Sequence, residues 1–202
     1  MKIAITAIAA IAGAATASPY FASAGGFEAT TVGNAGATAT ITVDISGIQT
    51  FDELGSTFNT VLGINIGGGS NVVGIGWDVN QLAGLDSGGA SWLSEMTIGF
   101  GNTFDGILIN LGTSGTDAPG TEANSSGGIV DLTALTTPLD FFVAADGILS
   151  LEFFESFVDQ AGAAEGEFLA NSTLTIQYVP VPAPGALALL GLGGIAAGRR
   201  RR

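Results

Sequence analysis

The sequence predicts an all-β fold, an antiparallel β-sandwich or jelly roll, and three observations lead to this prediction. Residues 25–178 are rich in Gly, Thr, Ser and Asn, and short apolar runs alternate there with turn residues. No part of that stretch has the 3.6-residue period of an amphipathic helix. Gly-containing turns such as "GGGSN" and "ADG" separate the runs at short intervals, which is typical of antiparallel sheets.

The clearest strand is "ATATITVDI", in which Thr alternates with apolar residues as in a half-buried strand. This run and the later ones predict strands over Ala37–Ile45, Asn71–Val79, Glu95–Gly101, Gly106–Gly112, Leu139–Ala144, Gly147–Phe157 and Ser172–Val179. The stretch 113–128, "TSGTDAPGTEANSSGG", is the longest expected loop and should lie on the surface.

The run "LEFFESF" (151–157) does not alternate cleanly between apolar and polar residues. A regular strand would either bury Glu155 or expose Phe154. A β-bulge near Phe153 would resolve this conflict, and we favour it. The alternative is that Glu155 points inward to a metal ion.

The "GIGWDV" run places Trp77 beside Asp78. The favoured interpretation is a core aromatic followed by a solvent-facing carboxylate. The alternative is a sugar-stacking or calcium site at a sheet edge.

The charge distribution excludes several classes of function. The chain of 202 residues has 5 basic and 18 acidic side chains, a net charge of −13, and no His or Cys. The basic residues are Lys2 and Arg199–Arg202, so residues 3–198 contain none. That stretch cannot neutralise nucleic-acid phosphates, and the chain cannot form a Ser-His-Asp or Cys-His site. Repulsion among the acidic side chains of this stretch would be relieved by salt or divalent cations.

The N-terminal residues 1–24 are predicted to be a secretory signal peptide, which implies export by the Sec machinery. Lys2 precedes an apolar stretch from Ile3 to Ala17, and small-x-small patterns follow, the second at Ala22 and Ala24. We expect cleavage after Ala24, so that the ectodomain spans 25–178. The alternative is a buried first helix.

The C-terminal segment 179–202 ends with "GALALLGLGGIAAGRRRR" after a Pro-rich step. Its 14 uncharged residues, 185–198, would span about 21 Å as a helix, less than the roughly 30 Å of a bilayer core. Terminal Arg side chains can lengthen that span and would stay on the cytoplasmic side. We therefore expect a short transmembrane helix that holds the ectodomain outside. The alternative is a buried core helix with a basic tail.

This tail has three features that, in the order in which they occur, resemble the bacterial PEP-CTERM sorting signal. They are Pro182-Ala183-Pro184, the apolar segment 185–194, and the cluster Arg199, Arg200, Arg201 and Arg202. Ala183 replaces the usual Glu, which makes this a Pro-Ala-Pro variant. The resemblance implies export, temporary retention in the membrane, and processing by an exosortase, in a family associated with exopolysaccharide and biofilm.

The resulting expectation is a non-enzymatic surface or extracellular-matrix protein without a cofactor, with polysaccharide and calcium open as ligands. Asp159, Glu165 and Glu167 are the candidate calcium ligands, because they crowd one loop and oxygen ligands suit this ion. The alternative is a secreted carbohydrate-active enzyme that uses a carboxylate pair. An enzyme should show a cleft with two convergent acids, whereas a matrix module should be a closed sandwich.

Overall fold

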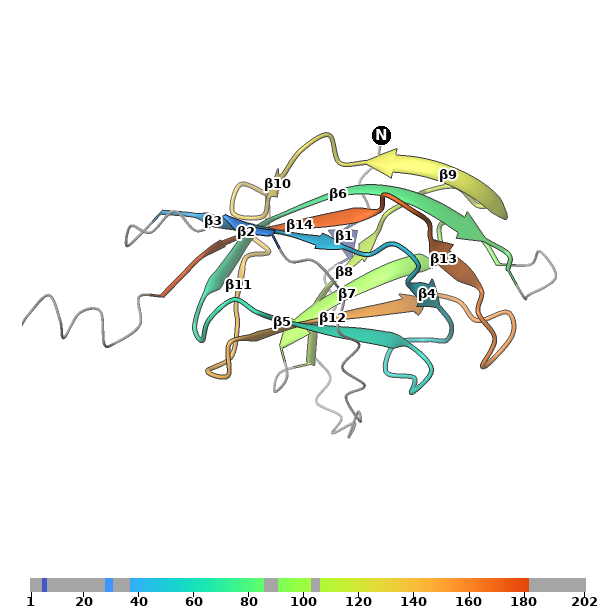
Figure 1. Cartoon of the computed structure of the whole chain (residues 1–202), viewed down its shortest axis with the longest axis horizontal. Helices are drawn as coiled ribbons and strands as arrows, with labels where there is room; N and C mark the ends of the chain where they lie inside the picture. Colours follow the sequence, from blue (N-terminus) through green and yellow to red (C-terminus); the bar gives the residue numbers. More distant parts are fainter. Residues whose placement is uncertain (1–4, 7–27, 31–36, 86–90, 103–105, 182–202) are drawn as a thin grey trace, which may run out of the picture.

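Two antiparallel sheets form the protein in the computed structural model, which describes residues 5–6, 28–30, 37–85, 91–102 and 106–181. All regular structure within these residues is β-strand (Figure 1). The strands are β1 (Ile5–Thr6), β2 (Glu28–Thr30), β3 (Ala39–Asp44), β4 (Gln49–Thr50), β5 (Thr60–Asn65), β6 (Asn71–Ala83), β7 (Met96–Asn102), β8 (Gly106–Gly112), β9 (Gly120–Ser125), β10 (Val130–Asp131), β11 (Phe141–Phe142), β12 (Ile148–Glu155), β13 (Gly166–Phe168) and β14 (Thr173–Val179). The predicted class, an all-β fold with antiparallel sheets, is confirmed.

The smaller sheet has the order β1-β8-β7-β12-β5. Strand β12 lies inside it and pairs with β5 on one side and with β7 on the other. The two-residue β1 pairs with β8 at the sheet edge, and it lies within the predicted signal peptide. The rest of that peptide lies outside the described residues.

The larger sheet is organised by β6, which is 13 residues long and pairs with several shorter strands in turn. Along one side, β14 pairs with its first half and β13 with its last residues. Along the other side, β11, β10 and β9 follow one another. Strands β3 and β4 pair with β14 and β13. The sheet therefore extends along the whole length of β6, about 40 Å at the usual rise per residue.

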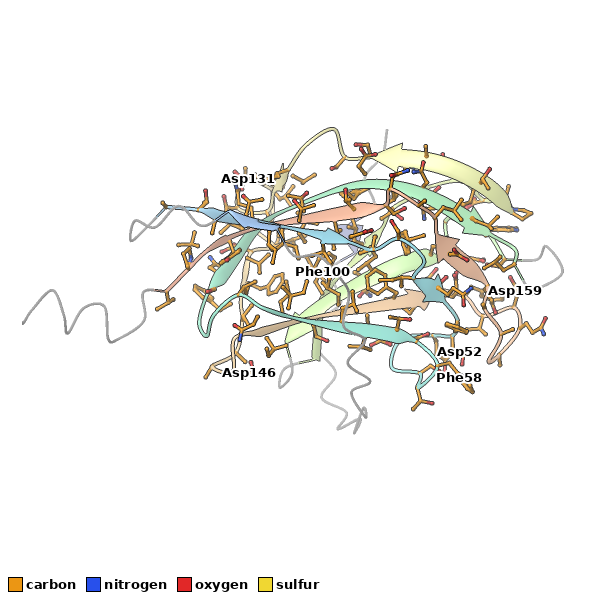
Figure 2. All side chains as sticks on the ribbon, viewed as in Figure 1. Asp52, Phe58, Phe100, Asp131, Asp146 and Asp159 are labelled. Carbon is orange, nitrogen blue, oxygen red and sulfur yellow. The ribbon has the colours of Figure 1, made fainter. Side chains whose placement is uncertain are left out.

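The two sheets form two layers (Figure 1). One hydrophobic core lies between them, because its buried residues come from both sheets. Strand β14 contributes Leu174 and Ile176 from alternate positions, as a half-buried strand does. Phe153 of the smaller sheet and Phe168 of the larger sheet pack edge to face, with ring centroids 5.7 Å apart. Phe100 lies between the layers in Figure 2 and is fully buried. Trp77 is also a core residue, as favoured from the sequence.

Two local expectations were wrong. The register of β12 is continuous against both neighbours through Phe153 and Phe154, so there is no bulge there and Glu155 points into a buried region. Phe154 is buried as well, because both faces of this end of β12 are covered. The expected loop 113–128 contains β9, which pairs with the last half of β6.

Candidate functional site

The predicted sorting and cleavage residues lie outside the described residues. These are Pro182, Ala183, Pro184, Arg199–Arg202, Ala22 and Ala24. The described chain nevertheless reaches the start of the tail, because β14 ends at Val179 and is followed by Pro180 and the exposed Val181. Among the described residues, we find no helix with the length and apolar character needed to cross a membrane.

The candidate calcium ligands are divided between two places. Glu165 is buried, and its carboxylate accepts hydrogen bonds from the backbone N–H groups of Asp159 (3.2 Å) and Gln160 (2.6 Å). Glu167 lies two residues further along, where the side-chain amide of Gln49 donates to it at 3.4 Å. The structure thus brings Asp159 and Glu165 together, and it places Glu167 with a different partner.

Glu155 is the most unusual acidic residue in the described part of the chain. Its side chain is fully buried, and the Thr50 hydroxyl donates a hydrogen bond to its Oε1 atom. Its Oε2 atom has no hydrogen-bond partner among the described residues. A buried polar atom left without a partner costs about 1–3 kcal/mol.

Desolvation by burial raises the pKa of Glu155 to about 8, and the Thr50 hydrogen bond opposes this only in part. The negative charges of Glu165, Glu95 and Asp159 raise that pKa further. Glu155 is therefore mostly protonated in neutral solution.

Glu95 belongs to the same group of carboxyl groups. Desolvation raises its pKa, and so do the charges of Asp159 and Glu165. The backbone N–H of Trp92 donates to its Oε2 atom at 2.7 Å, which opposes that rise. We refer to Glu95, Glu155, Asp159 and Glu165 as the acidic cluster.

Backbone hydrogen bonds fix the segments that carry the acidic cluster. The N–H of Glu155 donates to Asp52 O (3.0 Å), and the N–H of Ser156 donates to Glu95 O (2.8 Å). The N–H of Glu165 donates to Thr50 O at 2.9 Å. These bonds tie the end of β12 to the turn before β7 and to the segment around β4, so they link the two sheets.

Other carboxylates at this end hold loops together. Glu152 accepts from the Gly55 N–H (2.6 Å) and from the Asn59 side-chain amide (2.9 Å). Asp52 accepts from the Gly162 N–H at 2.7 Å and from the Ser56 hydroxyl at 2.9 Å. Figure 2 shows Asp52 and Asp159 at the same end of the molecule. Backbone N–H groups and hydroxyls thus supply the donors that basic side chains supply in other proteins.

The surface around these loops is shallowly hollowed and partly apolar. A hollow of about 300 Å³ is lined by Asp52, Glu53, Leu54, Gly55, Ser56, Val158 and Ala161. A second one, about 360 Å³, is lined by Asn80, Gln81, Thr121, Glu122, Ala123, Leu169 and Ala170. Three aromatic side chains on the loops near the acidic cluster are exposed to solvent: Phe58, Trp92 and Phe157.

Two members of the acidic cluster, Asp159 and Glu165, are predictable from the sequence, because they crowd one loop. An inward-facing Glu155 is only the alternative prediction, although the broken alternation of 151–157 is the pattern that indicates it. Glu95 was missed as a site residue. Only the fold reveals it, because it lies sixty residues before Glu155 in the chain.

The tail has a counterpart among known protein families. Residues 180–202 match the family model described as the PEP-CTERM protein-sorting motif. No curated protein and no solved structure matches the chain. A motif of this kind implies that the protein is exported, sorted to the cell surface and processed by an exosortase. The comparison thus shows that residues 180–202 carry the PEP-CTERM protein-sorting motif.

Proposed function

We propose that this protein is a non-enzymatic component of the bacterial surface or extracellular matrix. In this proposal, residues 1–24 direct export by the Sec machinery, and residues 179–202 hold the chain in the membrane by a short helix until an exosortase cleaves this segment near Pro182 or Pro184. A β-sandwich of the jelly-roll type, residues 25–178, is the part that remains. The observation that carries the proposal is the sorting motif at 180–202, which follows directly after β14.

The position of that motif supports the orientation we propose. Val179 pairs with Asn71 at the beginning of β6, whereas Gly166 pairs with Ala83 at its end. The start of the tail and the loops of the acidic cluster therefore lie at opposite ends of the larger sheet. A domain tethered through residue 180 would present those loops away from the membrane.

The hydrogen bonds of the acidic side chains support a non-enzymatic role. Glu152, Glu165 and Asp52 each accept two hydrogen bonds that hold loops in place. A glycosidase needs one carboxylate free to attack or to activate water and another free to donate a proton. Carboxylates engaged in this way are better suited to maintaining loop structure.

The ligand we propose is an extracellular polysaccharide. Phe58, Trp92 and Phe157 are 59%, 42% and 63% exposed, and they project from the loops near the acidic cluster. Exposed apolar side chains grouped in this way commonly mark an interaction site. Their flat apolar faces can pack against sugar rings, and neighbouring carboxylates such as Glu53 can accept hydrogen bonds from sugar hydroxyls.

The sorting role is tested by replacing Arg199–Arg202 with serine in the producing cell. Without these charges the tail no longer has a cytoplasmic stop, so we expect the protein to lose its membrane-held stage and to escape processing. Immunoblots of membrane, surface and medium fractions measure this change. Replacement with lysine is the matched control, because it keeps the charge. A serine variant that is distributed and processed like the wild type would contradict the proposal.

A further inference from the structure

Two loops, 51–59 and 156–164, meet in a partly apolar hollow at one end of the molecule. Its lining comes from both loops: Asp52, Glu53, Leu54, Gly55, Ser56, Val158 and Ala161. A Cβ atom at Gly162 would lie 3.6 Å from two ring carbons of Phe58, so the Phe58 ring of the first loop lies against the second loop. Phe157 directly precedes Val158 in the chain. We refer to the hollow together with Phe58 and Phe157 as the loop surface, and Figure 2 shows Asp52 and Phe58 at this end of the molecule.

The loop surface exposes large apolar side chains to solvent. Leu54, Phe58 and Phe157 are 39%, 59% and 63% exposed. Exposed apolar groups that gather around a hollow with polar neighbours commonly mark a binding site. A ligand that covers these side chains must therefore present apolar faces of its own.

Hydrogen bonds hold the two loops in this arrangement. The Gly162 N–H donates to Asp52 at 2.7 Å, which joins the second loop to the first. The Asn59 side-chain amide donates to the carbonyl oxygen of Glu53 (2.8 Å) and to Glu152 of β12 (2.9 Å). A ligand would meet loops that are already in place, so binding would cost less conformational entropy than the ordering of free loops.

The charge of the domain limits what this ligand can be. Residues 25–178 contain all 18 acidic side chains and no Lys, Arg or His. A polysaccharide with uronate, sulfate or phosphate groups would be repelled and would find no cation to pair with. A second copy of the domain would be repelled in the same way. The occupant that complements this surface therefore carries no negative charge.

Glu53 makes a positively charged group the best complement. Asp52 uses both carboxylate oxygens within the protein, because they accept from the Gly162 N–H and the Ser56 hydroxyl. Glu53 is exposed, and its carboxylate accepts no hydrogen bond from the described residues. An ammonium group would donate a charge-assisted hydrogen bond to Glu53, and the faces of the two exposed Phe rings attract ammonium groups as well. Sugars with free amino groups combine such a charge with apolar C–H faces.

We propose that the loop surface binds an extracellular polysaccharide whose sugars carry free amino groups. Phe58 and Phe157 pack against the sugar rings and their ammonium groups, and Glu53 accepts a hydrogen bond from an ammonium group. The inference rests on the proposed function, in which the ligand is a polysaccharide, and it names the chemical class of that polysaccharide.

The test is a calorimetric titration of the full-length chain with a short β-linked glucosamine oligomer. A mildly acidic buffer keeps the amines of the oligomer protonated, and sodium chloride at about 0.15 M screens long-range attraction. The matched probe is the N-acetylglucosamine oligomer of the same length, which has the same rings without the charge. We expect the glucosamine oligomer to bind at least about tenfold more tightly, because only its ammonium groups can interact with Glu53 and with the aromatic faces.

The double variant Phe58→Ala with Phe157→Ala should weaken binding of the glucosamine oligomer about tenfold, since each aromatic contact contributes roughly two- to fivefold. Both side chains are exposed, so the variant should fold normally, and circular dichroism checks this. Phe142→Ala is the matched control and should leave the affinity unchanged. Phe142 is 66% exposed, and it lies on β11, which pairs with the beginning of β6, away from these loops.

Glu53→Gln should weaken binding of the glucosamine oligomer roughly threefold, because an exposed ion pair is lost and the shape of the side chain is kept. Asp146→Asn is the matched control. It removes the same charge at the opposite end of the molecule (Figure 2), and asparagine can still accept from the Ile148 N–H.

Two results would overturn this inference. An affinity for the glucosamine oligomer no higher than for its acetylated counterpart would do so, and it would leave a polysaccharide as the proposed ligand. Unchanged binding in both the Phe58/Phe157 and the Glu53 variants would do so too, because attraction of the oligomer to the whole acidic domain would then account for the affinity. Failure of the Arg199–Arg202 experiment, with the preference for amino sugars intact, would remove the sorting proposal alone.

Discussion

At the scale of single residues, the domain stabilises its carboxylates without basic side chains. Asp131 accepts from the backbone N–H (2.8 Å) and the hydroxyl (2.6 Å) of Thr133, and these bonds lower its pKa. Hydrogen bonds from Ser46 lower the pKa of Asp44 in the same way. Glu155 is the opposite case, because burial outweighs its single hydrogen bond and raises its pKa.

The raised pKa of Glu155 predicts a pH-dependent stability in calcium-free buffer. The pKa is about 8 in the folded protein and near 4.5 in the unfolded chain, so the folded state binds the extra proton between those values. The stabilising contribution is complete below pH 4.5 and is lost as the pH rises through about 8. It is on the order of a few kcal/mol, at about 1.4 kcal/mol for each unit of pKa difference.

Urea unfolding from pH 5 to 9 measures this contribution. The wild type should lose stability over that range, and Glu155→Gln should remove most of the slope, because the amide does not titrate. Glu152→Gln is a suitable comparison, since Glu152 is also buried but accepts two hydrogen bonds. Equal slopes in wild type and Glu155→Gln would show that other groups cause the pH dependence.

At the scale of the elements, close packing over β6 explains two of its glycines. A Cβ atom at Gly76 would lie 2.9 Å from the carbonyl oxygen of Gly128, and one at Gly74 would lie 2.5 Å from a methyl carbon of Ile129. The segment around 128–129 therefore crosses the outer face of β6 directly on its backbone. This explains why the strand reads "NVVGIGWDV" and not as a simple alternation.

Gly76→Ala should therefore destabilise the protein, by about 1–3 kcal/mol, because the clash is with backbone and cannot be relieved by a side-chain rotation. Chemical denaturation measures the change in the free energy of unfolding. Gly115→Ala is the control, since a Cβ atom there meets nothing within 4 Å, and its effect should stay within about 0.5 kcal/mol. An equally small effect at Gly76 would mean that the crossing segment is not seated on β6.

The strands that the sequence predicts well are those with one apolar face. Strand β8 has the predicted bounds, and β3, β7, β12 and β14 begin or end within a few residues of theirs. Strand β9 was missed because it buries none of its side chains fully and joins the sheet through backbone pairing with β6. Apolar periodicity reports burial, so it cannot reveal such a strand.

The acidic cluster was only partly predictable for a related reason. Asp159 and Glu165 are close in the sequence, so the sequence alone shows that they crowd one loop. Glu95 and Glu155 come together through the pairing of β7 with β12, which places Glu155 opposite Met96. That pairing depends on the register of two strands separated by about fifty residues, and no local pattern specifies it.

At the scale of the whole molecule, the charges are divided between the ends of the chain and the domain. All five basic residues lie at positions 2 and 199–202, and all 18 acidic residues lie between them. Removal of both ends would leave a domain with no basic side chain. The carboxylates of such a domain repel those of other copies, which keeps the copies apart in solution. They also repel one another within the domain, and a saline medium screens this repulsion.

In the proposed processing, both ends of the chain are removed and the β domain is the mature protein. The intact mass of the protein recovered from the cell surface or the medium tests this processing. We expect the mass of a chain that begins near Gly25 and ends near Pro182 or Pro184, without Lys2 and without any of the four arginines. A mass from the same fraction that still includes Arg199–Arg202 would contradict it.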